Sequence, residues 1–182
     1  MAQHVLISGG ARSGKSRFAL HLAQQRGTRR AFIATAQAFD DEMEARINAH
    51  RAERASTFTT FEEPVNLALC LRRASEDHDV VVIDCLTLWL SNLLHFHREN
   101  EREVSRELER TFETLQKLST PTIAVVNEVG LGIVPSTPLG RGFRDASGRM
   151  QKSWADAADE VYAAAFGIIV RFKPNPVEAV WG

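Results

Sequence analysis

The sequence predicts an α/β fold in which a mostly parallel sheet is flanked by helices. Short apolar runs alternate along the chain with longer segments of helical periodicity, and crossovers of that length join parallel strands. The run Asp79–Asp84 is an unbroken series of β-branched residues between two aspartates. Such a run indicates a strand that is buried on both faces, as strands of parallel sheets are.

A single domain over residues 1–182 is expected from the length of 182 residues and the mass of 20.3 kDa. The hydrophobic share of 44% and the charged share of 25% are ordinary for a globular protein. The net charge of −1 offers no basic field for nucleic acid, and no apolar run is long enough to span a membrane. Cys70 and Cys85 lie in apolar runs without metal-site spacing, so we expect buried thiols and a cytoplasmic protein.

Each element is expected from its own local pattern. The expected strands are a run ending in Gly9, Arg30–Thr35, Thr57–Phe61, Asp79–Asp84, Thr122–Asn127, Val161–Phe166 and Ile168–Phe172. The expected helices are one ending near Gly27, then Asp40–Arg54, Pro64–Ala74, Leu86–Leu94, Glu99–Leu118 and, after a Gly/Pro-rich connection over Glu128–Gly142, one ending near Asp159. The last two strands form an antiparallel hairpin around Gly167, and the tail 174–182 is expected to be loose.

A phosphate-binding motif follows the first strand. Gly9, Gly14, Lys15 and Ser16 match the pattern G-x-x-x-x-G-K-[ST], in which backbone N–H groups turn inward on a phosphate. Lys15 supplies a positive charge to the β- and γ-phosphates, and the Ser16 hydroxyl is a ligand for Mg²⁺. The expected nucleotide contacts are the whole loop: Gly9, Gly10, Ala11, Arg12, Ser13, Gly14, Lys15 and Ser16.

Ligands of parallel sheets bind beyond the carboxyl ends of the strands, and this rule adds Thr35, Asp84 and the segment from Asn127 to the site. Asp84 ends its strand as a Walker-B aspartate does, and we expect it to hold Mg²⁺ directly or through water. The alternative is a strand-end aspartate that caps the next helix. No N-K-x-D motif follows the later strand, so a switch-type GTPase is not supported.

His50 differs from the other histidines in its surroundings. In a helix over residues 40–54, Arg46 and Arg54 lie four positions either side of His50 on one face. Two neighbouring guanidiniums lower the pKa of an imidazole and favour its neutral, nucleophilic form. The same two arginines could also hold phosphates close to it. A solvated charged helix face is the alternative, and spacing alone favours that alternative.

Arg141 and Arg144 lie beside a Gly/Pro-rich loop at the start of the last helix. One interpretation is that they keep the surface soluble. The other is that they bind phosphate or stabilise transition-state charge, in their own subunit or across a subunit boundary. The residues leave both readings open.

Together these motifs resemble the bifunctional adenosylcobinamide kinase/adenosylcobinamide-phosphate guanylyltransferase family of cobalamin biosynthesis. The resemblance runs in order from about residue 5 to residue 173 and is carried by Ser8–Ser16, Ile33–Ala36, Asp40–Met43 with Arg46-Ile47 and His50-Arg51, Asp84–Leu94, Asn127–Pro135, Arg141, Phe143–Asp145, Gly148-Arg149 and Ala158-Asp159. One departure is Gln151-Lys152, where the family usually has Asn-Gln.

The resemblance implies a RecA-like P-loop fold, a homotrimer and two reactions. ATP or GTP phosphorylates the aminopropanol hydroxyl of adenosylcobinamide. GTP then donates GMP to that phosphate through a guanylylated histidine, which falls on His50, and pyrophosphate and adenosylcobinamide-GDP result. By the same resemblance, Arg51 and Glu62 join the nucleotide contacts. A P-loop kinase without a covalent intermediate and a non-enzymatic nucleotide-dependent interaction module are the competing interpretations.

Overall fold

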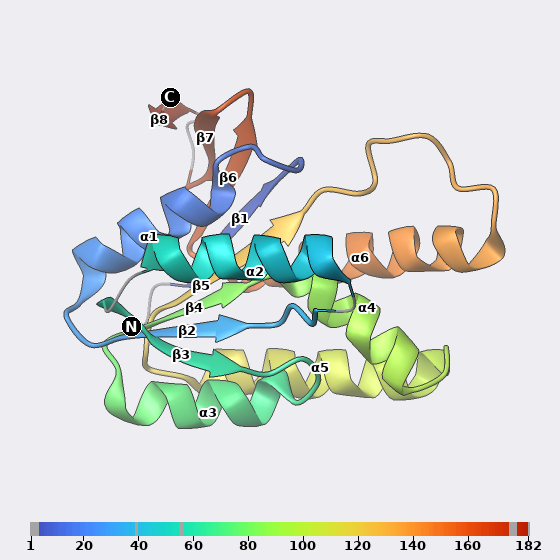
Figure 1. The fold of residues 1–182 in the computed structure, drawn as a ribbon, viewed down its shortest axis with the longest axis horizontal. Coiled ribbons are helices and arrows are strands. Elements are labelled where there is room, and N and C mark those ends of the chain that lie inside the picture. The colour runs from blue at the N-terminus through green and yellow to red at the C-terminus, as the bar shows by residue number, and fades with distance from the viewer. Residues whose placement is uncertain (1–3, 39, 55–56, 175–177, 182) are drawn as a thin grey trace.

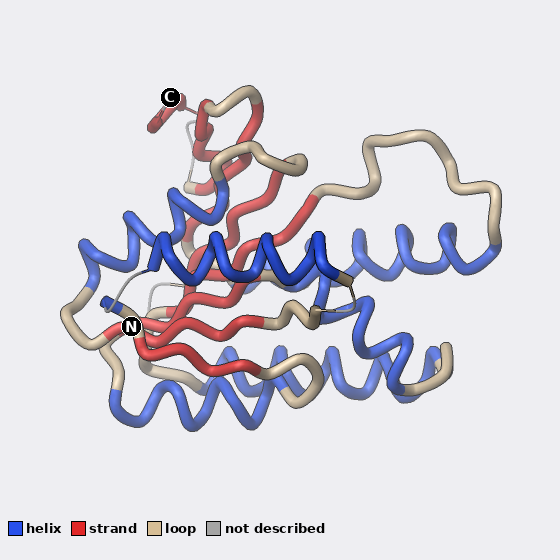
Figure 2. The backbone as a smooth tube through the Cα atoms, viewed as in Figure 1, coloured by secondary structure: helices blue, strands red, loops and turns tan. Residues whose placement is uncertain are grey.

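The computed structural model describes residues 4–38, 40–54, 57–174 and 178–181. Within these ranges the strands form one eight-stranded sheet in the order β3-β2-β4-β5-β1-β6-β7-β8 (Figures 1 and 2). The strands are β1 Val5–Gly9, β2 Arg30–Ala34, β3 Thr59–Glu62, β4 Val80–Asp84, β5 Thr122–Asn127, β6 Glu160–Ala165, β7 Ile168–Lys173 and β8 Glu178–Trp181.

The strands from β3 to β6 in this order are mutually parallel, and β7 and β8 add antiparallel pairs at one edge. The central strands β1, β4 and β5 are almost wholly buried, as expected for a parallel sheet covered on both faces. The predicted α/β fold with a C-terminal antiparallel hairpin is therefore confirmed.

Six described helices cover the two faces of the sheet: α1 Lys15–Arg26, α2 Asp41–Arg54, α3 Leu67–Asp77, α4 Leu86–Phe96, α5 Glu101–Lys117 and α6 Pro138–Ala157. Figure 1 shows α1 and α2 on one side of the sheet, with α3 and α5 on the other. Buried residues of α3, α4, α5 and α6 share one apolar cluster with alternate residues of the strands, and buried residues of α1 belong to a second. Right-handed crossovers explain this division.

The last helix begins earlier than the sequence predicts. Instead of a connection that reaches Gly142, α6 begins at Pro138 and includes Gly140 and Gly142. Thr137 caps it, because its hydroxyl accepts a hydrogen bond from the N–H of Gly140 at 3.1 Å. Pro138 occupies the first turn, where its missing N–H costs nothing. The cap outweighs the low helix propensity of the two glycines.

The expectation of a loose tail is wrong for residues 178–181. This segment forms β8, which pairs antiparallel with β7. Without β8, the outer edge of β7 would present unpaired N–H and C=O groups, and the added strand satisfies them.

Cys70 and Cys85 are both free thiols and both buried, as predicted. Among the described residues, no helix is long and apolar enough to cross a membrane.

Candidate active site

The phosphate-binding loop joins the carboxyl end of β1 to the amino end of α1. Gly9 has a φ of 152°, and a Cβ atom there would lie 2.3 Å from the backbone oxygen of Ala164 on β6. Gly14 has a φ of 94° and is the residue from which α1 starts. Side chains at either position would be strained, so the loop keeps the backbone path that the motif requires. The N-terminal N–H groups of α1 follow directly.

Lys15 is almost fully buried, with only 5% of its surface exposed. Its ammonium group donates a hydrogen bond of 2.5 Å to the backbone oxygen of Gly10 and lies 3.4 Å from the hydroxyl of Ser13. The positive charge is thus held inside the loop by the loop's own oxygen atoms. Such a charge is well placed to meet a polyphosphate without first losing its own solvent shell.

The strand register brings the other predicted residues together at the carboxyl ends of the strands. Asp84 pairs with Ala34 on one side and with Val125 on the other, and Glu62 pairs with Ala34. Asn127 pairs with Gly9, and the N–H of Glu128 donates to the oxygen of Gly9 at 3.0 Å. The carboxyl ends of β1 to β5 therefore form one rim with the phosphate-binding loop.

Lys15 and Asp84 act on the same buried thiol. Burial above all, and then the Asp84 carboxylate, raise the pKa of Cys85 to about 11, whereas the Lys15 ammonium lowers it. Both charges are therefore within electrostatic range of Cys85, at the point where β4 ends. A carboxylate and a hydroxyl are oxygen ligands of the kind that Mg²⁺ prefers, so Asp84 and Ser16 make a chemically suitable pair for that ion.

Thr35 has no exposed surface in this structure. Its hydroxyl donates to the backbone oxygen of Cys85 at 2.7 Å and accepts from the N–H of Cys85 at 2.8 Å. The side chain therefore joins the ends of β2 and β4. Thr35 thus lies at the predicted place, and its contact with a nucleotide stays a prediction.

Helix α4 contributes polar residues that the sequence reasoning did not single out. Asn92 donates from one amide nitrogen to the backbone oxygens of Thr35 and Pro64, at 2.8 and 3.1 Å. The Thr87 hydroxyl accepts from the N–H of Asn127 at 2.7 Å. These contacts hold the loops beyond β2, β3 and β5 in place. The sequence does carry a signal for them: Thr87 and Asn92 are polar residues within an otherwise apolar helix, and a buried polar group needs a hydrogen-bond partner.

Helix α2 is attached to the rim through an ion pair between Arg51 and Glu62. Both side chains are at least half exposed, so the pair is weak. His50 lies next to Arg51 within α2, as predicted. The side chains of His50 and Arg46 lie outside the part of the chain that the structure describes.

Comparison with known proteins decides which class of P-loop protein this is. The family model described as "Cobinamide kinase / cobinamide phosphate guanyltransferase" matches residues 5–172. The chain belongs to this family. The resemblance predicted from the motifs is confirmed, and with it the enzyme's two activities, a kinase and a guanyltransferase.

Relatives within the family are similar over almost their whole length. "Bifunctional adenosylcobalamin biosynthesis protein CobP" of Pseudomonas aeruginosa is 42% identical over 172 residues, covering 94% of this chain and 98% of the relative. "Bifunctional adenosylcobalamin biosynthesis protein CobU" of Escherichia coli is 36% identical over 180 residues, covering 93% of this chain and 99% of the relative.

Solved structures with little sequence identity share the fold. The RadB recombinase superposes with a TM-score of 0.58 at 16% identity, covering 98% of this chain and 86% of that one. A solved ATPase domain gives a TM-score of 0.53 at 14% identity, covering 98% of this chain and 80% of that one. The P-loop, RecA-like fold of this cobinamide kinase family member is thereby confirmed.

The two arginines of α6 differ in their surroundings. The Arg141 guanidinium donates to the backbone oxygens of Pro135 and Ser136, at 3.1 and 2.9 Å, so it holds the preceding loop onto the helix. Arg144 is largely covered, with 24% of its side chain exposed, and lies 3.4 Å from the Asp145 carboxylate. Figure 1 shows the first turns of α6 projecting past the sheet.

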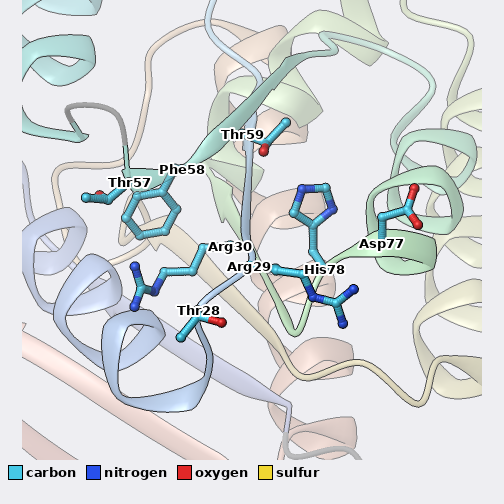
Figure 3. Close-up of a pocket in the computed structure, with 8 residues that line it drawn as sticks. All are labelled: Thr28, Arg29, Arg30, Thr57, Phe58, Thr59, Asp77 and His78. Carbon is cyan, nitrogen blue, oxygen red and sulfur yellow. The ribbon is translucent and has the colours of Figure 1, made fainter.

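A hollow of about 320 Å³ lies at the other end of the strands, where β2 and β3 begin (Figure 3). Two of its polar side chains have partners within the fold. Arg29 forms an ion pair with Asp79 at 2.7 Å, and a ring nitrogen of His78 lies 2.9 Å from the backbone oxygen of Ala74. The hollow is therefore separate from the rim that carries the family's motifs.

Proposed function

We propose that this enzyme phosphorylates the aminopropanol hydroxyl of adenosylcobinamide with ATP or GTP, and then transfers GMP from GTP to that phosphate through a guanylylated His50. The products are adenosylcobinamide-GDP and pyrophosphate. The convergence of the phosphate-binding loop, Asp84 and the Arg51–Glu62 pair on one edge of the sheet supports this function most strongly. One nucleotide site there can serve both reactions if the nucleotide is held differently in each.

In the kinase reaction, the substrate hydroxyl oxygen forms a bond to the γ-phosphorus while the bond from that phosphorus to the β–γ bridging oxygen breaks. The nucleoside diphosphate leaves, and the hydroxyl proton passes to solvent. Lys15 and the N–H groups of the loop stabilise the charge on the phosphate oxygens. Ser16 and Asp84 would hold Mg²⁺, which neutralises charge on the β- and γ-phosphates when it is bound.

In the guanylyl transfer, a neutral imidazole nitrogen of His50 bonds to the α-phosphorus of GTP, and the α–β phosphoanhydride bond breaks to release pyrophosphate. A phosphate oxygen of the corrinoid then attacks the same phosphorus, and the N–P bond breaks to free His50. Arg46 and Arg51, on the same helix, supply positive charge to the phosphates. Glu62 offers a carboxylate to the N–H donors of guanine. Arg144 supplies a clamp for the charge that develops on the phosphates in both transfer reactions.

A product assay tests the proposed sequence of reactions. Adenosylcobinamide incubated with enzyme, Mg²⁺, ATP and GTP is expected to yield first a phosphorylated and then a GDP-linked corrinoid, separated by chromatography and identified by mass. Without GTP, the reaction should stop at the phosphorylated compound. If GTP is present and the product still stops there, the enzyme is a kinase without the second activity.

The proposed homotrimer is supported by the exposed apolar residues that follow β5. Leu131 is 91% and Ile133 96% exposed, and Val134 and Leu139, nearby in the chain, are also exposed apolar residues. Exposed apolar residues gathered in one segment are typical of a surface that contacts another protein, and we infer a second copy of this chain as that partner. A heterologous contact that closes after three copies gives a ring.

The replacement Ile133→Asp is expected to weaken this assembly, raising its dissociation constant roughly thirtyfold or more because a charge enters an apolar contact. Sedimentation velocity should then show a shift from three copies towards the monomer mass of 20.3 kDa. Leu69→Asp, on the exposed side of α3, is the matched control. A parent enzyme that sediments as a monomer at all concentrations would contradict the trimer.

A further inference from the structure

A side-chain bridge connects α6 to the base of the phosphate-binding loop. The hydroxyl of Ser8, the last side chain of β1 before Gly9, donates to the amide oxygen of Gln151 at 3.1 Å. The amide nitrogen of Gln151 donates to the hydroxyl of Ser147, one turn earlier in α6, at 3.3 Å. Ser147 is completely buried. Gln151 therefore contacts the strand with one end of its amide and its own helix with the other.

Hydrogen bonds and apolar packing contribute differently to the placement of α6. Met150 and Trp154 pack into the apolar core, but apolar contacts are non-directional and permit small rotations and shifts of a helix. The amide of Gln151 has fixed donor and acceptor directions. Its bridge therefore adds a directional contact between α6 and β1 beside the phosphate-binding loop.

The part of the molecule placed in this way is the α6 arm, which we define as residues 128–149. The arm is attached to the end of β1 at two points: the N–H of Glu128 bonds to the oxygen of Gly9 at 3.0 Å, and Gln151 bonds to Ser8 at the arm's other end. Pro138 lies thirteen residues before Gln151, or about 20 Å along the helix. A small rotation at Gln151 therefore moves the far end of the arm by a larger distance.

Arg144 lies on this arm and on the same face of α6 as the bridge. It precedes Gln151 by seven residues, which is close to two full turns and about 10 Å along the axis. Its side chain is largely covered. We therefore expect the orientation of Arg144 to respond to the contact between Gln151 and Ser8.

We propose that Gln151 is a positioning residue, which sets the α6 arm and its Arg144 against the phosphate-binding loop for the transfer reactions. This inference rests on the charge-clamping role proposed for Arg144. It concerns a position at which this chain departs from the usual Asn of its family, and the longer glutamine side chain is the one seen to reach Ser8.

The test compares kinase kinetics of Gln151→Leu, Arg144→Ala and the double variant, using adenosylcobinamide and ATP. Gln151→Leu is expected to lower kcat roughly tenfold, because a misplaced group loses transition-state contacts, with KM for ATP nearly unchanged. Arg144→Ala is expected to lower kcat roughly a hundredfold. The double variant should match Arg144→Ala, because a residue that acts only through Arg144 has no effect once Arg144 is absent.

Three further variants separate positioning from folding. Gln151→Glu should retain most of kcat, because its carboxylate can accept from both serine hydroxyls. Ser8→Ala should reproduce Gln151→Leu by removing the same bond from the other side. Lys152→Ala, the exposed neighbour that pairs with Asp156, should behave as the parent. Thermal unfolding of every variant checks that the fold is kept.

The outcomes are distinct. An unchanged kcat in folded Gln151→Leu and Ser8→Ala overturns the inference and leaves the role of Arg144 standing. Equal losses from Gln151→Leu with and without Arg144 also overturn it, since the effect then bypasses that arginine. An unaffected Arg144→Ala refutes the proposed clamp itself, and the inference with it.

Discussion

Replacing His50 by alanine is expected to abolish guanylyl transfer while leaving phosphorylation of adenosylcobinamide within about twofold of the parent. Loss of a covalent nucleophile lowers kcat by on the order of 10⁴-fold or more, whereas the kinase reaction uses the loop and Asp84 and has no step through His50. Separate assays of the two products measure both rates. The variant should therefore accumulate phosphorylated corrinoid in the presence of GTP.

His21→Ala is the matched control, because His21 is an exposed histidine on α1 whose ring nitrogen lies 3.1 Å from the side-chain nitrogen of Gln25. It should retain both activities. Equal loss of both activities in His50→Ala would assign His50 to nucleotide binding in general. Retention of guanylyl transfer would exclude the covalent route.

Replacing Lys15 by methionine is expected to lower both activities roughly a thousandfold, because a buried charge that stabilises phosphate oxygens is removed. Methionine fills similar volume without the ammonium group, so the loop should keep its shape. Steady-state rates of each reaction, with nucleotide affinity measured by calorimetry, test this result. Lys117→Met, an exposed residue at the end of α5, is the control with the same substitution.

The comparison of the two rates in Lys15→Met also tests whether both reactions use one nucleotide site. If only the kinase rate falls, guanylyl transfer takes place at a second nucleotide site that does not involve the phosphate-binding loop. Parallel loss is the result expected if one rim binds the nucleotide for both reactions.

The strands and the phosphate-binding loop were predictable because their signals are local. The β-branched run before Asp84 and the spacing of Gly9, Gly14 and Lys15 each determine a conformation over a few residues. The common edge then followed from the rule that parallel strands carry ligands at their carboxyl ends. These predictions needed no knowledge of which strands are neighbours.

Long-range contacts were beyond such reasoning. Ser8 and Gln151 are 143 positions apart, and nothing in the local sequence of either indicates the other. Thr35 is in the predicted place, but its hydroxyl turns towards Cys85 because β2 and β4 are neighbours. The tail was misjudged for the same reason, since β8 exists only where β7 offers an open edge.

The chemical role of His50 is the claim on which the account depends most, and one labelling experiment tests it directly. Enzyme incubated with Mg²⁺ and GTP labelled at the α-phosphate, without corrinoid, should acquire label that is lost in acid, survives alkali and maps to the peptide containing His50. GTP labelled at the γ-phosphate should leave the protein unlabelled. Absence of α-label, or equal labelling of His50→Ala, would contradict the covalent mechanism.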